Sequence, residues 1–435
     1  MSALRLWLLL RRGAAATSRL PEVLAVLAFA VSSGAMLVVL GGLHAMIVRW
    51  QAAPEDGAAQ LYLWLAVVAS GLMVIPILTL GGQAARLTLA RRNERLAILR
   101  LCGATTAQTS VITMAETLVQ AGLGALLGLG LYGLSLPLLT LIGFRGVRLS
   151  WAELWIGPGW LALGLLSVLV LALVSGLICL AGVAVTPLGV ANRVSPKRLR
   201  TVRVVIAGGM LLAWPVLFSY LPAAGLVLMA LGTVAVVNLV GPWLLMAFGS
   251  AMAGAARTAP TLLAARRIVD DPRSAWRACS AFALVIMLAT LSSFTTVLGT
   301  AGDDELPRDL STGAVITMVI VSVVAATSSG VVHASRVIDQ APVYRSLTLA
   351  GTEVAVLDAT RLREIVWPLA VTALTAGGFA TLLLLPLSLQ APLALPRFAV
   401  AVLGSAALTV VALLASRPLL LRAARPVVHQ ELTSA

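Results

Sequence analysis

Residues 91–105 bring charged side chains together with the signals that end one helix and begin another. Residues 91–102 are predicted to form a helix, because Leu96 and Leu99 share one face with Gly103 while the arginines lie elsewhere on its surface. Long apolar runs flank the stretch on both sides. Its side chains suit contact with a partner protein, and no catalytic residues are predicted here.

The end of this predicted helix is followed at once by a second helix start. Gly103 suits the left-handed conformation just past a helix end. Residues 105–108, Thr-Thr-Ala-Gln, have the form of a capping box. The stretch therefore predicts a helix, a sharp turn and a second helix, and such a rigid elbow can transmit a push from a soluble partner into a membrane helix. The alternative is a surface helix whose arginines only anchor the loop.

The same pattern returns in weaker form about 248 residues later. Residues 347–353 align with residues 99–105, so that Gly351 stands in the place of Gly103. A repeated pattern at a fixed interval indicates a repeated structural unit. The sequence therefore predicts two elbows, one in each half of the chain.

The elements around the elbows are predicted to be membrane helices. The chain of 435 residues is 60% hydrophobic and 11% charged, whereas soluble domains carry roughly 25% charged residues. Several apolar runs exceed the roughly 20 residues that a helix needs to cross a bilayer. The runs are continuous rather than alternating, which argues against a transmembrane barrel.

Ten apolar runs predict ten membrane spans with both termini on the cytoplasmic side. They cover residues 22–48, 61–85, 110–136, 159–185, 204–220, 223–248, 274–299, 311–333, 364–387 and 398–415. We expect a first four-helix repeat in residues 1–190, a basic linker and two-helix insert in residues 191–250, and a second four-helix repeat in residues 251–435. The predicted fold is an all-α polytopic membrane protein with two parallel repeats, arranged 4 + 2 + 4, and no large extracytoplasmic domain.

The formal charge of +14 could suggest a nucleic-acid partner, but its distribution predicts none. With the ten spans in place, only five of the 31 Lys and Arg residues fall in outer loops: Arg49, Arg145, Arg148, Arg308 and Arg397. This asymmetry is typical of the positive-inside rule. The three cysteines and three histidines lack the spacing of a disulfide framework or a metal site.

Several polar residues in or near the spans are candidates for a site. Glu116 and Glu364 each lie thirteen residues after a repeated glycine, where a carboxylate is either functional or paired with nearby arginines. Asn238 could bridge two helices or contact a substrate. An acidic loop could attract a cationic substrate or form a solvated turn; it holds Asp303, Asp304, Glu305 and Asp309.

Two further patterns predict local structure. Asp271 followed by Pro272 predicts a helix start, since aspartate caps helices and proline suits the first helical position. Four glycines in the third span are predicted to permit close helix packing, namely Gly122, Gly124, Gly128 and Gly130.

The first elbow resembles a known signature. The pattern Arg-x-Glu-Arg-x-x-x-Leu-Arg-x-x-Gly-Ala-Thr-x-x-Gln runs through residues 92–108, and Glu116 and glycines follow. It resembles the FtsX-like permeases, the membrane subunits of MacB-type ABC transporters. The resemblance implies ATPase coupling through Arg91, Arg92, Glu94, Arg95, Leu99, Arg100, Gly103, Ala104, Thr105 and Gln108. For the second copy it implies the same role for Tyr344, Arg345, Leu347, Gly351 and Thr352.

The resemblance also implies partners. Separate ABC ATPase subunits, two for the two elbows, would bind ATP and Mg. This chain has no Gly-x-x-x-x-Gly-Lys-[Ser/Thr] loop, so we expect no cofactor in it and no enzymatic activity of its own. The expected function is that of a permease in the bacterial plasma membrane, surrounded by lipids, that couples the ATPase to export or extraction of a lipid, an antibiotic or a hydrophobic peptide.

The chain departs from the family in two ways. Val343 and Thr348 stand where the first elbow has Arg95 and Arg100, so we expect the ATPase to bind the first elbow more firmly. The links between the first two spans of each repeat are only about 10 to 12 residues long, where many members carry a large domain. Two alternatives remain open: an ATPase-driven signalling or regulatory module, and an ion-coupled secondary transporter, which would need charged residues at mid-membrane.

Overall fold

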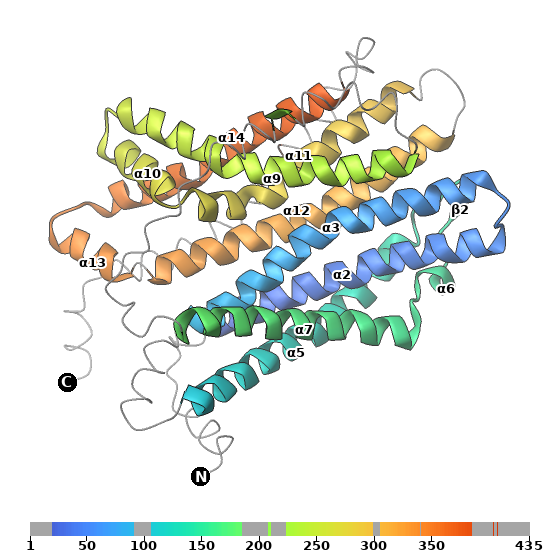
Figure 1. Ribbon diagram of the computed structural model, residues 1–435, viewed down its shortest axis with the longest axis horizontal. Helices are drawn as coiled ribbons and strands as arrows, with labels where there is room; N and C mark the ends of the chain where they lie inside the picture. The colour runs from blue at the N-terminus through green and yellow to red at the C-terminus, as the bar shows by residue number, and fades with distance from the viewer. Residues whose placement is uncertain are drawn as a thin grey trace. The chain divides into compact units, whose positions relative to one another are not determined.

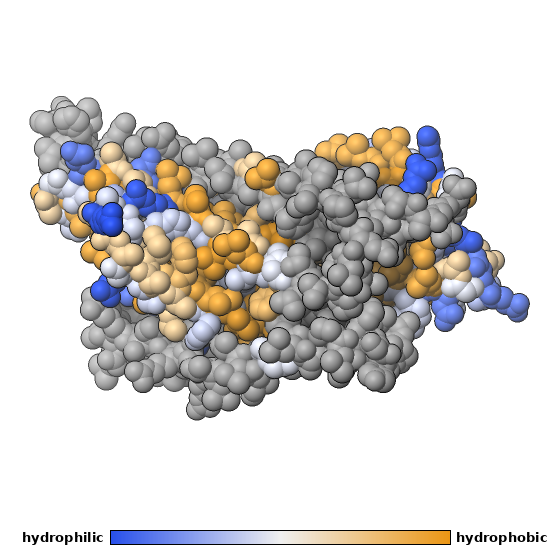
Figure 2. Space-filling view, turned by 90° about the horizontal axis from the view of Figure 1, so that it is seen from above, coloured by the Kyte–Doolittle hydropathy of each residue, from blue (hydrophilic) through white to orange (hydrophobic). Residues whose placement is uncertain are grey.

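The computed structural model describes residues 20–90, 106–184, 208–209, 223–298, 305–339 and 341–384, together with residues 403 and 407. Nearly all of these residues are helical. Within them, six helices are long and apolar enough to cross a membrane. Hydrophobic residues cover much of the visible middle of the helices, whereas hydrophilic residues gather toward their ends (Figure 2). The protein is therefore a multi-pass α-helical membrane protein, and it forms two compact units, Met1–Val194 and Ser195–Ala435.

Unit 1 is built from four long helices that run alongside one another (Figure 1). They are α2 (Leu20–Ala52), α3 (Gly57–Ala90), α5 (Thr106–Leu139) and α7 (Gly157–Ala184). Helix α2 makes the most extensive contacts of the four, chiefly with α3 and α5. Between α5 and α7 lie a small antiparallel hairpin, β1 (Gly143–Phe144) and β2 (Val147–Arg148), and the single turn α6 (Trp151–Leu154).

Two glycines of α5 allow its backbone to approach α2 closely. A Cβ atom on Gly128 would lie 2.7 Å from the Ala30 carbonyl oxygen, and one on Gly124 would lie 3.0 Å from the carbonyl oxygen of Val26. The predicted role in close packing is thus confirmed for these two. It is wrong for Gly122 and Gly130: among the described residues, no atom of another helix lies within 4 Å of a Cβ atom at either position. All four share one helix, but only positions one turn apart on the side that faces α2 meet it.

Unit 2 is organised around one central helix, α11 (Pro272–Leu298), which packs against α9, α12 and α14 and also contacts α10. The remaining helices are α9 (Ala223–Gly254), α10 (Ala259–Asp270), α12 (Glu305–Asp339), α13 (Ala341–Leu349) and α14 (Val354–Leu384). As predicted, Asp271 caps α11: its Oδ1 accepts from the Ser274 N–H at 3.1 Å. The core of unit 2 joins Phe282 and Ile286 of α11 to Ile365 of α14 and Leu245 of α9.

Trp276 of α11 packs against helix α9 and forms a hydrogen bond with it. Trp276 Nε1 donates to Asn238 Oδ1 at 3.0 Å, which confirms that the asparagine bridges two helices. Gly241 lies one turn further along α9, and a Cβ atom there would collide with the Trp276 ring. Helix α9 therefore packs as part of unit 2, through both an indole hydrogen bond and a close ring-to-backbone contact.

Helix starts recur at one interval in the two units. Helices α3 and α12 begin at residues 57 and 305, and helices α5 and α14 begin at 106 and 354, so both pairs are 248 residues apart. At this interval the packing residues Gly124 and Gly128 fall on Thr372 and Ala376, which are completely buried. In unit 1, α2 packs against both α3 and α5, and in unit 2, α11 packs in the same way against both α12 and α14.

The structure corrects the prediction for the acidic loop. Helix α12 begins at Glu305, six residues before the predicted span, and Asp309 in its second turn is only 6% exposed. Acidic residues are favoured near helix N-termini, which explains the early start. This part of the loop is therefore helix rather than solvated turn, while Asp303 and Asp304 lie outside the described residues.

Candidate functional site

The predicted first elbow lies almost entirely outside the described residues. This holds for Arg91, Arg92, Glu94, Arg95, Leu99, Arg100, Gly103, Ala104 and Thr105. Gln108 is exposed in the first turn of α5. The second elbow and its surroundings in unit 2 are therefore the place where the geometry of the candidate site is seen.

The second elbow has the geometry of a helix, a sharp turn and a second helix. The N–H of Thr352 donates to the Leu347 carbonyl at 2.9 Å, and that of Gly351 donates to the Thr348 carbonyl at 3.0 Å. Gly351 has φ = +89°, the left-handed conformation that glycine adopts without a steric cost. These are the two hydrogen bonds of a Schellman motif. They end α13 sharply, and α14 begins three residues after the glycine.

Helix α13 offers a mainly exposed surface. It packs against the preceding α12. Val343 and Leu349 are exposed, while Leu347 is half-buried. Thr352 is half-buried at the turn, and the side chains of Tyr344 and Arg345 lie outside the description. A short surface helix joined through a fixed turn to a long helix can pass a displacement from one to the other.

After the elbow, the third turn of α14 is joined to α10 by two arginines, one from each helix. Arg267 of α10 pairs with Glu364 of α14, with 3.4 Å between Nη1 and Oε2. Arg363 Nη1 donates to Thr258 Oγ1 at 3.1 Å and to Thr261 Oγ1 at 2.6 Å. The Glu364 side chain is 11% exposed, so the pairing alternative holds for this carboxylate.

The equivalent carboxylate in unit 1 also interacts. Glu116 is half-buried in α5 and takes part in at least one hydrogen bond or electrostatic interaction. Neither glutamate is therefore an isolated charge within the helices. The hydrogen bonds of Arg363 with Thr258 and Thr261 were not predicted, because no local sequence pattern links residues that are 102 or more positions apart.

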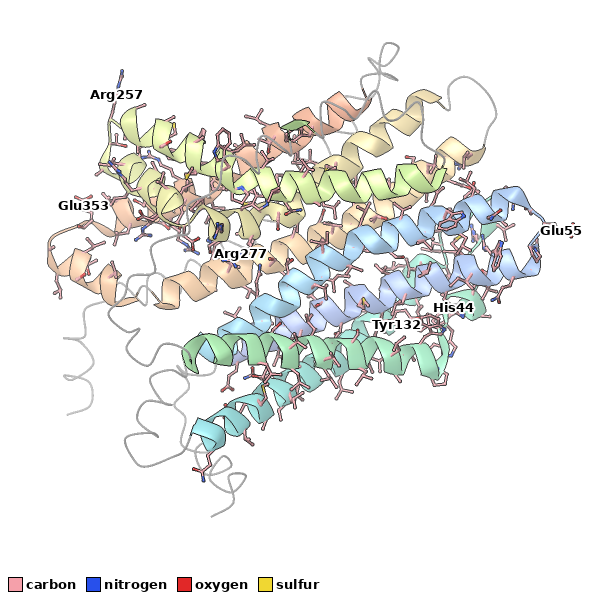
Figure 3. The ribbon with its side chains drawn as sticks, viewed as in Figure 1. His44, Glu55, Tyr132, Arg257, Arg277 and Glu353 are labelled. Carbon is pink, nitrogen blue, oxygen red and sulfur yellow. The ribbon has the colours of Figure 1, made fainter. Side chains whose placement is uncertain are left out.

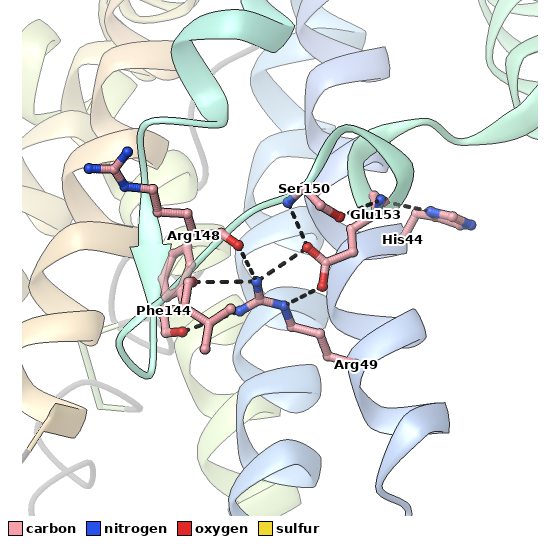
Figure 4. A network of polar contacts seen from close by, with 7 residues as sticks. His44, Arg49, Phe144, Arg148, Ser150 and Glu153 are labelled. Carbon is pink, nitrogen blue, oxygen red and sulfur yellow. Dashed lines mark hydrogen bonds and ion pairs between the residues drawn. The ribbon is translucent and has the colours of Figure 1, made fainter.

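Unit 1 carries a second polar cluster that the sequence did not predict, where α2 meets α6 (Figure 4). Arg49 Nε donates to Glu153 Oε1 at 2.8 Å, and its Nη2 donates to Glu153 Oε2 at 3.2 Å. The Ser150 N–H donates to Glu153 Oε2 and the Glu153 N–H donates to Ser150 Oγ, which closes a capping box around α6. The Ser-x-x-Glu pattern at Ser150 and Glu153 is a local signal that could have indicated the capping box.

Arg49 also holds the hairpin. Its guanidinium donates to the carbonyl oxygens of Phe144 at 3.2 Å and Arg148 at 3.0 Å (Figure 4). On the neighbouring turn of α2, His44 Nδ1 lies 2.9 Å from the Glu153 carbonyl oxygen. One end of α2 thereby ties together the strands and α6, and Figure 3 shows His44, Tyr132 and Glu55 at this same end of unit 1.

The turn of the hairpin is held from the other side by the connection between α2 and α3. Arg145 and Gly146 both have positive φ, 56° and 71°, as a two-residue hairpin turn requires. Arg145 Nη1 donates to Asp56 Oδ2 at 2.6 Å. This hydrogen bond and the Ala58 N–H that also donates to the carboxylate hold the pKa of Asp56 below its ordinary value.

The Arg145→Ala substitution is expected to raise the pKa of Asp56 toward the ordinary value of about 3.9. A carboxyl whose pKa is lowered on folding stabilises the fold above its unfolded pKa, and this contribution is lost as the pH falls through the folded pKa. Carboxyl NMR of aspartate-labelled protein would measure the titration. Arg148→Ala on the same hairpin is the control, and an Asp56 midpoint that ignores the loss of Arg145 would contradict the assignment.

The polar contacts of the described residues hold helices, turns and the hairpin together. No group of three or more His, Cys, Asp or Glu side chains that could hold a metal ion occurs among them. Arg49, Arg145 and Arg267 each pair with a carboxylate, and the second elbow forms a rigid turn. Comparison of the chain with known protein families, with curated proteins and with solved structures finds no match.

Proposed function

We propose that this protein is the membrane subunit of an ATP-driven transporter of the FtsX-like type, coupled to a separate ABC ATPase. The observation that carries the proposal is the geometry of the second elbow. A mainly exposed helix, α13, is joined through the Schellman turn at Gly351 to the long helix α14. Because the turn is fixed by two backbone hydrogen bonds, a partner that displaces α13 displaces the start of α14 with it.

The 248-residue repeat supports an equivalent elbow, the first elbow, in unit 1. The helices on either side of residues 91–105 begin 248 residues before the helices on either side of α13. We therefore propose ten membrane helices in a 4 + 2 + 4 arrangement, two ATPase subunits for the two elbows, and both termini on the cytoplasmic side of a bacterial plasma membrane. ATP and Mg would bind in the ATPase, and this chain would perform no hydrolysis.

The substrate that fits this subunit is lipophilic or amphipathic. The connection between α2 and α3 is only four residues, and the hairpin end of unit 1 is closed by the contacts of Arg49 and Asp56. Neither of these two described connections has room for a large soluble domain that could capture a substrate from water. Many large apolar side chains on α5 and α7 are exposed, as expected of helices that contact lipid. We propose that the substrate, a lipid, an antibiotic or a hydrophobic peptide, is taken from the bilayer.

The experiment is co-expression of the chain with a candidate ATPase, for instance one encoded beside it, followed by co-purification and measurement of ATP hydrolysis in lipid nanodiscs. We expect the ATPase to co-purify and its hydrolysis to depend on this chain. Transport of a fluorescent lipid or an antibiotic in proteoliposomes then separates transport from signalling without transport. Failure of any ATPase to bind would refute the proposal.

The Gly351→Val substitution is expected to reduce the coupled ATP hydrolysis about 5- to 30-fold. Valine at φ = +89° costs on the order of 1–2 kcal/mol, which shifts the elbow toward other conformations by that factor. Gly254→Val, at the end of α9 with nothing within 4 Å, is the control. Arg95→Glu combined with Gly103→Pro should reduce hydrolysis further, since the first elbow keeps the arginines. Unchanged hydrolysis in both elbow variants would contradict the coupling role.

A further inference from the structure

Helix α10 follows a candidate membrane span, α9, and precedes α11, whose residues 274–299 the sequence predicts to cross the membrane. The candidate membrane span of α9 ends at Gly254, and α10 begins at Ala259, so only four residues separate them. At its other end, α10 is followed directly by α11, with Asp271 as the only residue between them. A 12-residue helix fixed in this way cannot move far from the bilayer.

The outward face of α10 combines apolar and cationic side chains. Ala264, Ala265 and Ile268 are buried, and α10 packs against α9 and α14. On the opposite face, Leu262 is 42% exposed and Leu263 is 38% exposed. Arg266 is also exposed, one helical turn beyond these two leucines. Exposed leucines next to a basic side chain are typical of a helix that lies in the headgroup layer of a membrane.

The two consecutive arginines of α10 have different environments. Arg267 is half-buried and pairs with Glu364, so its charge is used within the protein. Arg266 is exposed on the outward face. This difference separates a structural arginine from one that is available to a partner, and it provides a matched pair of variants.

Helix α11 adds two more exposed arginines at the same end, and each also takes part in at least one interaction within the protein. Arg273 and Arg277 lie one turn apart and are both exposed, whereas residues 281–286, further along the same helix, are buried. Arg257, in the link between α9 and α10, is exposed as well, and Figure 3 shows it at the same end of unit 2 as Glu353. Two exposed acids lie nearby, Asp270 and Asp271, and Asp271 already accepts the Ser274 N–H.

We propose that the outward face of α10 and the first turns of α11 bind the headgroups of anionic phospholipids. Arg266, Arg273 and Arg277 would donate to the phosphate oxygens, a geometry for which guanidinium groups are suited. Leu262 and Leu263 would enter the boundary between headgroups and acyl chains. The occupant is a lipid rather than a protein because α10 is fixed at the bilayer and its leucines and arginine share one face. This inference does not depend on the transport function proposed above.

The test measures lipid binding to the purified full-length chain in detergent, by native mass spectrometry and by the shift in unfolding temperature. Phosphatidylglycerol should bind and stabilise, and phosphatidylcholine should not. The triple variant R266Q/R273Q/R277Q should bind phosphatidylglycerol more weakly by about fivefold for each arginine removed. Inorganic phosphate at millimolar concentration should not compete, because it lacks the acyl chains that the leucines contact.

Two control variants separate this site from general effects. Arg267→Gln should lower the unfolding temperature by breaking the pair with Glu364, yet leave the affinity for phosphatidylglycerol unchanged. Arg308→Gln, at an exposed position near the start of α12, should leave both unchanged. Equal binding of the two lipids, or unchanged affinity in the triple variant, would overturn the proposal. A triple variant that binds lipid normally but loses an ATPase partner would assign this face to the protein instead.

Discussion

Replacing Gly128 with valine is expected to separate α5 from α2 and to leave little folded unit 1. The Cβ atom alone would lie 2.7 Å from both the Ala30 carbonyl oxygen and the Gly34 nitrogen, and it would collide with Ser33 Oγ. Backbone atoms cannot rotate away as a side chain can, so the two helices must move apart. We expect a loss of about 3 kcal/mol or more in the free energy of unfolding, at the upper end for overpacked cores.

The same substitution at Gly130 or Gly122 is the matched control. Both glycines lie in α5, so the helix propensity of valine is the same, but no other part of the described structure lies within 4 Å of a Cβ atom at either position. Thermal unfolding in detergent, followed by size-exclusion chromatography, would compare the three variants. If Gly128→Val and Gly130→Val unfold at the same temperature, the close contact between α2 and α5 is not the one described.

Truncation of Trp276 to alanine is expected to cost about 3–5 kcal/mol, as for other large aromatic side chains in a core. Trp276 is 3% exposed and lies in the hydrophobic core of unit 2. It also donates the hydrogen bond to Asn238 and covers Gly241. Its loss should therefore loosen α9 from α11, which limited proteolysis between residues 255 and 258 would detect as faster cleavage.

Two further variants divide this effect into its parts. Trp276→Phe retains an aromatic ring but loses the N–H donor, so it should cost only about 1 kcal/mol for the hydrogen bond, plus a packing loss. Trp155→Ala, at a position that is 51% exposed, should have little effect on the unfolding temperature. A Trp276→Ala protein as stable as Trp155→Ala would mean that α9 does not depend on this contact.

Local signals determined much of the secondary structure in advance. Apolar runs longer than a bilayer is thick can only be helices in lipid, because every backbone group must find its partner within the segment. The order of the described helices, the Asp271 cap and the glycine turn at 351 all follow from residues close together in the chain. The recurrence of helix starts at one interval was likewise present as a faint pattern around the two elbow glycines.

The tertiary structure alone decided which side chains meet. Arg49 and Glu153 are 104 residues apart, and Arg267 and Glu364 are 97 apart, so no local pattern pairs them. The four glycines of α5 look alike in sequence, yet only two face α2. Both outcomes depend on how each helix is rotated about its axis and on the neighbour it meets, and these are set by packing across the whole unit rather than by neighbouring residues.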